Sequence, residues 1–120
     1  LLFIFCRMMM LYEELQRKSL PKNFELTSES LKTFYIEDGS LTTLSGHNKL
    51  CLAVNGFTEA EADIIRNKIK ILLHSDKVFL HNYKQGPTIW IFTRSSIKKF
   101  FDFIGPCPDE LENVFGYKWR

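Results

Sequence analysis

The spacing of apolar residues changes repeatedly along this 120-residue chain, and the order of the changes restricts the fold. Three segments have apolar side chains at helical intervals, namely residues 28–38, 58–74 and 95–104. Between them lie four short extended runs, which pair as 40–44 with 49–54 and as 78–83 with 88–93. The resulting order, α-β-β-α-β-β-α, predicts an α+β fold with one antiparallel four-stranded sheet covered by helices on one face.

Local signals mark the ends of these elements. Thr58 and Glu61 have the spacing of a capping box, so they predict the start of the second helix. Ser95 or Ser96 is the predicted N-cap of the third helix. Pro87 has no N–H and cannot continue a central ladder, which places it in the turn of the second hairpin rather than in a strand.

The first helix ends in an unusual way, at Glu37-Asp38-Gly39. Thr27 is its predicted N-cap and Gly39 its predicted C′ residue. Carboxylates at the C-terminus of a helix face the negative end of the macrodipole, which is unfavourable unless a positive charge compensates. A divalent cation shared with phosphate would provide that charge, so this junction indicates a metal site.

Two stripes of side chains run along the same helix. One stripe contains Leu31, Phe34, Tyr35 and Asp38. The other is narrower and contains Ser30, Thr33 and Glu37. The helix is therefore expected to make contacts on two sides.

Three stretches occur in a recognisable order. They are Ser19–Thr27 followed by the helix and Asp38-Gly39-Ser40, then Asn55–Glu61, and finally Ile104–Pro108 followed by Gly116–Trp119. Together they resemble the LAGLIDADG homing endonucleases, and more closely the second repeat of the two-motif, intron-encoded branch. The resemblance divides the chain into a helical connector at 1–18 and an endonuclease-like domain at 19–120, which would mean that the family's first repeat is absent from this sequence.

The resemblance also implies a function and a site. The function is site-specific hydrolysis of duplex DNA with Mg²⁺ or another divalent metal. Asp38 matches the family's metal-binding acid, and the carbonyl neighbourhood of Gly39 would assist it. Lys118 matches a basic residue close to the active centre, where it would stabilise charge on the phosphate or orient solvent.

In this family the uncovered sheet face is a saddle that lies along the DNA major groove. The residues that would contact DNA are Lys49, Lys77, His81, Asn82, Lys84, Gln85 and Arg94. One repeat supplies one acid, so a duplex needs a second motif, from a homodimer or from the first repeat. The predicted helix interface is Ser30, Thr33 and Glu37, although two Glu37 carboxylates facing each other would be costly to bury.

Composition sets weaker limits. The net charge of +2 and a pI near 8.5 permit nucleic-acid binding without requiring it. Three widely spaced cysteines predict neither a disulfide framework nor a zinc site, and they favour an intracellular, reducing location. The apolar run at residues 1–6 is too short to span a bilayer.

Three other functions remain open from the sequence. A degenerate relative would bind DNA without cutting it, and cleavage in magnesium separates this case from an active enzyme. A maturase-like relative would aid RNA splicing, and salt-sensitive binding to structured RNA would identify it. The last alternative is an unrelated α+β domain.

Overall fold

A computed structural model describes residue 20 and residues 24–44 and 47–120. The elements are α2 (Ser28–Asp38), β1 (Gly39–Leu44), β2 (His47–Ala53), α3 (Glu59–Leu73), β3 (Val78–Tyr83), β4 (Gly86–Ile91) and α4 (Arg94–Ile104). A C-terminal segment adds η1 (Asp109–Leu111), α5 (Glu112–Phe115) and η2 (Gly116–Trp119). The predicted order is confirmed, and the C-terminal segment was not predicted. The connector at 1–18 lies outside the described residues.

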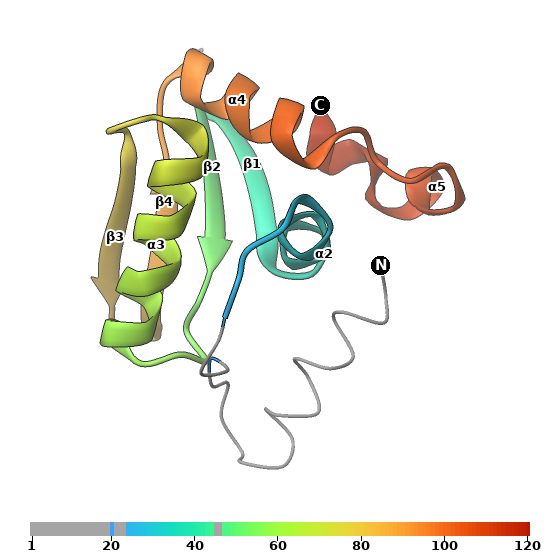
Figure 1. The fold of residues 1–120 in the computed structure, drawn as a ribbon. Coiled ribbons are helices and arrows are strands. Elements are labelled where there is room, and N and C mark those ends of the chain that lie inside the picture. The colour runs from blue at the N-terminus through green and yellow to red at the C-terminus, as the bar shows by residue number, and fades with distance from the viewer. Residues whose placement is uncertain (1–19, 21–23, 45–46) are drawn as a thin grey trace.

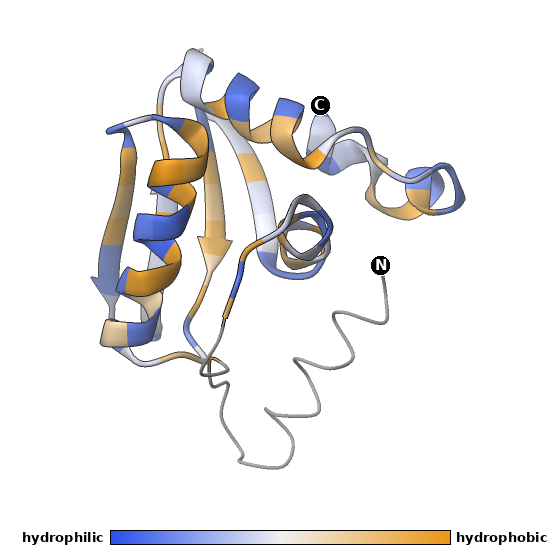
Figure 2. Cartoon of the chain, in the orientation of Figure 1, coloured by the Kyte–Doolittle hydropathy of each residue, from blue (hydrophilic) through white to orange (hydrophobic). Residues whose placement is uncertain are grey.

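The four strands form one antiparallel sheet in the order β1-β2-β4-β3. Figure 1 shows α3 and α4 in front of this sheet, with α2 viewed nearly end-on beside β1. The side chains that point toward the helices form the core of the domain, and Leu50, Leu52, Ile89 and Ile91 are fully buried there. Figure 2 shows the matching hydrophobic colour along β2. The predicted fold class is therefore confirmed.

Successive strand residues point to opposite sides of a sheet, so the remaining positions define the other face. We call it the open face, and it carries Ser40, Thr42, Lys49, Cys51, Phe79, His81, Tyr83, Thr88 and Trp90. None of these residues is buried. The open face is thus the side on which the described part of the chain leaves the sheet uncovered.

The helix starts are fixed by side-chain caps. Thr27 accepts a hydrogen bond from the Ser30 N–H, and Thr58 with Glu61 forms the predicted capping box. The prediction of Ser95 or Ser96 as the cap of α4 is wrong. Thr93 is the cap, because its hydroxyl accepts from the Ser96 N–H, and α4 begins at Arg94.

Three strands begin earlier than predicted. β1 starts at Gly39 instead of residue 40, β2 at His47 instead of residue 49, and β4 at Gly86 instead of residue 88. Pro87 therefore lies within a central strand, contrary to the prediction. It is tolerated near the strand start, where its carbonyl accepts a hydrogen bond from the Val54 N–H at 3.1 Å.

α2 ends at Asp38 as predicted, but Gly39 does not have the left-handed conformation that is usual for a glycine in the C′ position. Its backbone is extended, with φ −95° and ψ 161°, and it begins β1 directly. A glycine is needed there for a different reason. A Cβ atom would lie 2.6 Å from the Tyr35 carbonyl oxygen and closer still to Cδ1 of the Tyr35 ring. Close packing against Tyr35, rather than a positive φ, selects this glycine.

None of the helices in residues 24–44 and 47–120 combines the length and the apolar character that a bilayer crossing requires.

Replacing Gly39 with alanine is expected to lower the free energy of unfolding by about 1 to 3 kcal/mol, because the new methyl group overpacks the contact with Tyr35. Urea denaturation measures the change. Ser40→Ala is the matched control at the next position, which is exposed, and it should cost much less. Equal stabilities for the two variants would contradict this explanation of Gly39.

Candidate active site and nucleic-acid interface

The C-terminus of α2 places its two acids differently. Asp38 is half-buried and Glu37 is exposed. The last turn of α2 contains no basic residue, so no charge on the helix itself offsets the negative end of the dipole. The compensating charge must come from elsewhere, as the sequence indicated.

Lys118 supplies that charge from the C-terminal segment. Its Nζ donates a hydrogen bond to the Ile36 carbonyl at 2.5 Å and lies 5.6 Å from the centre of the Phe115 ring. Only 8% of Lys118 is exposed. Burial lowers the pKa of its ammonium, while the negative charges of Glu37 and Asp38 act in the opposite direction. Lys118 and Asp38 therefore share one end of α2.

Tyr35 holds the C-terminal segment in place. Its hydroxyl donates to the Lys118 carbonyl, and its ring makes edge contacts with Phe100, Phe101 and Trp119 at centroid distances of 5.4, 5.6 and 5.3 Å. Burial raises the pKa of Tyr35, so the hydroxyl stays protonated and remains a donor. Lys118 is positioned by packing rather than lying in a frayed terminus.

The residues at this helix end are compatible with a divalent metal. Mg²⁺ is usually held by one or two carboxylates together with phosphates of the substrate, and Asp38, beside the buried Gly39 backbone, would supply one such carboxylate. Within the described ranges, no three His, Cys, Asp or Glu side chains lie close enough together to hold a metal ion. A complete site would need ligands from DNA or from a second motif.

The predicted DNA-contacting residues are spread over one side of the sheet and its edges. Lys49 and His81 lie on the open face, and Lys77 directly precedes β3. Lys84 and Gln85 form the β3–β4 turn and are exposed, and Arg94 is the first residue of α4.

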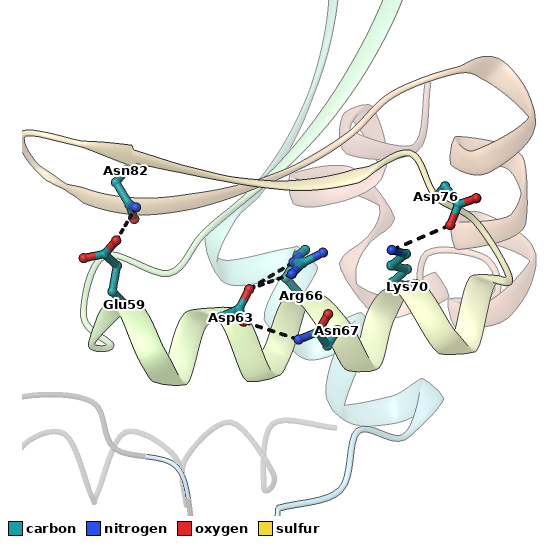
Figure 3. Close-up of polar contacts among 7 residues, drawn as sticks. All are labelled: Glu59, Asp63, Arg66, Asn67, Lys70, Asp76 and Asn82. Carbon is teal, nitrogen blue, oxygen red and sulfur yellow. Dashed lines mark hydrogen bonds and ion pairs between the residues drawn. The ribbon is translucent and has the colours of Figure 1, made fainter.

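Asn82 is the exception. The alternation of β3 turns it toward the helices, where its side-chain amide donates to the Glu59 carboxylate at the start of α3 (Figure 3). Its placement beside the DNA-contacting residues was wrong, because it lies an odd number of positions from His81. The same view shows further polar contacts along α3, including Asp63 with Arg66 and Lys70 with Asp76.

Lys49 and Arg94 meet at one groove of about 600 Å³. It is lined by His47, Asn48, Lys49, Phe92, Thr93 and Arg94. Lys49 Nζ lies 5.7 Å from the centre of the Phe92 ring, a cation–π distance. Sequence reasoning missed Phe92, although its alternation with Trp90 places it on the same side.

The sheet is free of acidic residues. None of the 14 Asp and Glu residues falls in segments 39–58 or 77–101, which contain all four strands. The same segments contain Lys49, Lys77, Lys84 and Arg94. The net charge of the whole chain is therefore modest although the charged residues of the sheet segments are all positive. Such a surface is suited to binding a polyanion.

The predicted helix interface is largely occupied within the chain. Thr33 is 2% exposed, and its hydroxyl donates to the Glu29 carbonyl. The Ser30 side chain takes part in the Thr27 cap. Glu37 is the exposed member of the three.

The solved structure of the homing endonuclease I-WcaI bound to its DNA recognition sequence is similar to this chain, with a TM-score of 0.69 and 20% sequence identity. The match covers 91% of this chain and 52% of I-WcaI. The chain has a LAGLIDADG homing endonuclease fold. That likeness concerns the fold, and no protein-family model matches the sequence.

One relative is similar in sequence. The protein of Methanocaldococcus jannaschii described as "Uncharacterized protein MJ1098" is 36% identical over 109 residues, which cover 85% of this chain and 42% of that protein. The chain thus spans about half the length of the proteins that it matches.

The pKa of Lys118 gives a testable dependence on pH. Because the folded-state pKa is lowered, the unfolded chain binds more protons between that value and 10.5, so folding becomes more favourable as pH rises through this window. The difference in free energy of unfolding between the wild type and Lys118→Met should change in favour of the wild type as the pH rises toward 10.5. Urea titrations at several pH values measure this difference. Lys84→Met, at an exposed turn lysine, is the control and should show no such gain. A pH-independent difference would contradict the burial of a charged Lys118.

Proposed function

We propose that this chain is one repeat of a site-specific DNA endonuclease that hydrolyses duplex DNA with a divalent metal. The observation that carries the proposal is the junction of α2 and β1, where half-buried Asp38 and buried Lys118 share one helix end beside an acid-free sheet. The homing endonuclease fold supports the same conclusion. Hydrolysis of a phosphodiester needs a carboxylate to hold the metal and a cation to receive developing charge, and this junction offers both.

Each residue has a distinct role in this proposal. Asp38, with the adjacent Gly39 backbone, would hold the metal. When bound, the metal would polarise the phosphoryl group and lower the pKa of the attacking water. Lys118 donates to Ile36 at the same helix end as Asp38, so it would orient solvent or stabilise charge on the phosphate. Tyr35 is fully buried and donates to the Lys118 carbonyl, so it would position Lys118 without contacting the substrate.

DNA would lie across the open face. Lys49 and Arg94 border the groove at one end of it, and Lys84 and Gln85 extend from the β3–β4 turn. Lysine and arginine fix the position of the phosphates, whereas Gln85 and His81 have side chains that can read base edges. Asn82 is not part of this set, because it is bound to Glu59.

A duplex has two strands, and one chain offers one Asp38. We propose that a second motif completes the enzyme, from a homodimer that pairs two α2 helices or from a first repeat. A homodimer would favour a nearly palindromic site, because identical surfaces would read both halves. Glu37 is exposed on α2 and would face such a partner, where it needs a proton, a metal or a cation to offset its burial.

One observation supports a second candidate, a DNA-binding relative that does not cut. Lys118 already offsets the negative end of α2 by donating to Ile36, so the helix end does not need a metal for its stability. Such a protein would bind duplex DNA equally well with and without magnesium.

Asp38→Asn should abolish magnesium-dependent cleavage and leave the affinity for duplex DNA unchanged or slightly higher, because it removes a metal ligand together with a negative charge near phosphate. Gel analysis of a cleavable duplex and a binding titration in calcium provide the two readouts. Glu29→Gln, at the exposed opposite end of α2, is the matched control and should retain cleavage. Cutting by Asp38→Asn at the wild-type rate would rule out the role of Asp38.

Alanine at both Lys84 and Arg94 should weaken duplex binding for all sequences. The slope of log K against log salt should become shallower by up to about one unit for each phosphate interaction that the substitutions remove. Fluorescence anisotropy at several salt concentrations measures that slope. Lys98→Ala is the control, since Lys98 is an exposed α4 lysine that pairs with Asp102. If the double variant kept the wild-type slope, these two residues would lie away from the DNA.

A further inference from the structure

The β3–β4 half of the open face is built from aromatic rings. Trp90 and Phe92 are stacked, with centroids 6.1 Å apart and ring planes 9° apart. Phe79 lies 5.6 Å from Phe92 and pairs with Trp90 across the strands. His81 and Tyr83 form a second contact at 4.7 Å. We call Phe79, Trp90 and Phe92 the aromatic strip.

The strip is partly exposed, and one of its rings is restrained. Phe79 is 45% exposed, Trp90 and Phe92 are half-buried, and the neighbouring Tyr83 is 44% exposed. The Trp90 indole donates to the Tyr83 hydroxyl at 3.1 Å, which restrains the indole ring. Exposure of large aromatic side chains is unfavourable in water, so a contiguous exposed group of this kind marks a binding surface.

The chemistry of the strip differs from that of the neighbouring strands. On β1 and β2 the open face carries Ser40, Thr42 and Lys49, which can donate or accept hydrogen bonds. Readers of duplex DNA need such groups, because only base edges are accessible in a groove. Aromatic rings match base faces instead, and those are accessible only where a strand is unpaired.

Charge around the strip selects the kind of partner. Lys49 lies over Phe92, Lys77 precedes the strand of Phe79, and Arg94 follows Phe92 at the groove. No Asp or Glu occurs in segments 39–58 and 77–101. Aromatic rings beside these cations, on a sheet without acidic residues, suit a ligand that combines flat apolar groups with negative charge.

We propose that the aromatic strip binds single-stranded nucleic acid. Unpaired bases stack on Phe79, Trp90 and Phe92, while Lys49, Lys77 and Arg94 contact the backbone phosphates. This function goes beyond the proposed cleavage of duplex DNA and does not require Asp38 or a metal. It would let the same sheet hold a strand that has left a duplex, or an unpaired loop of RNA.

The test uses the whole chain in EDTA, which removes any metal-dependent step. A fluorescently labelled mixed-sequence DNA strand, on the order of 12 nucleotides, is titrated and followed by anisotropy. An RNA strand of the same sequence and the DNA duplex are measured in parallel. We expect a lower Kd for at least one single strand than for the duplex.

Variants locate the binding surface. Phe79→Leu and Phe92→Leu should each raise the Kd for the single strand by roughly tenfold, the scale of one base–aromatic stack. Phe79→Tyr retains a ring and should bind like the wild type. Tyr117→Leu is the control, because Tyr117 is an aromatic residue with 65% exposure in the C-terminal segment. The duplex Kd should change less than the single-strand Kd.

The two tryptophans provide a second readout. Trp119→Phe leaves Trp90 as the single indole, and a bound strand should quench its emission. The proposal is overturned if single strands bind no better than the duplex, or if Phe79→Leu and Phe92→Leu bind them like the wild type. A concentration-dependent dimer that Phe79→Leu abolishes, without oligonucleotide quenching, would also overturn it. Cleavage assays on Asp38→Asn would still test the nuclease function separately.

Discussion

The contact between Tyr35 and the C-terminal segment determines where the candidate chemistry can occur. The Tyr35 ring fills the space between α2, α4 and η2, and its hydroxyl binds the backbone of Lys118. Because the ring occupies the space beside β1, only glycine fits at position 39. One aromatic side chain therefore fixes the path of the chain after Asp38 and the position of the lysine beside it.

Charge at the end of α2 follows from this packing. An acid at a helix C-terminus is unfavourable, and the Lys118 ammonium offsets it by donating to the Ile36 carbonyl. Burial opposes the charge on Lys118, and the nearby acids favour it. Lys118 and the two acids thus depend on one another, so their energetic contributions are not additive.

The sequence predicted element order well and side-chain positions less well. Helical spacing and the Thr58 capping box were sufficient for α3, because local interactions determine them. The cap of α4 was misplaced by two or three residues because Thr93, Ser95 and Ser96 all carry hydroxyl groups that can cap a helix. Only the three-dimensional structure shows that Thr93 accepts from the Ser96 N–H. Asn82 was misassigned because it directly follows His81 in β3, and neighbouring residues of a strand point to opposite faces of the sheet.

The candidate site was predicted in part. The matching motifs pointed to Asp38 and Lys118, and in the structure the negative charge of Asp38 acts on the Lys118 ammonium. Its hydrogen bond to Ile36 could not be predicted, since 82 positions separate the two residues. The aromatic strip was also missed, because alternating aromatic residues indicate a strand whether their rings are buried or exposed.

The separation between Asp38 and Lys118 has a consequence for synthesis. A chain emerging from the ribosome presents α2 and most of the sheet long before residue 118 exists, and the early elements fold first. The partly made protein would have its carboxylate but not the buried lysine or the segment that orients it. An activity that requires both groups would therefore be absent from any partly made chain that has Asp38 but has not yet reached Lys118.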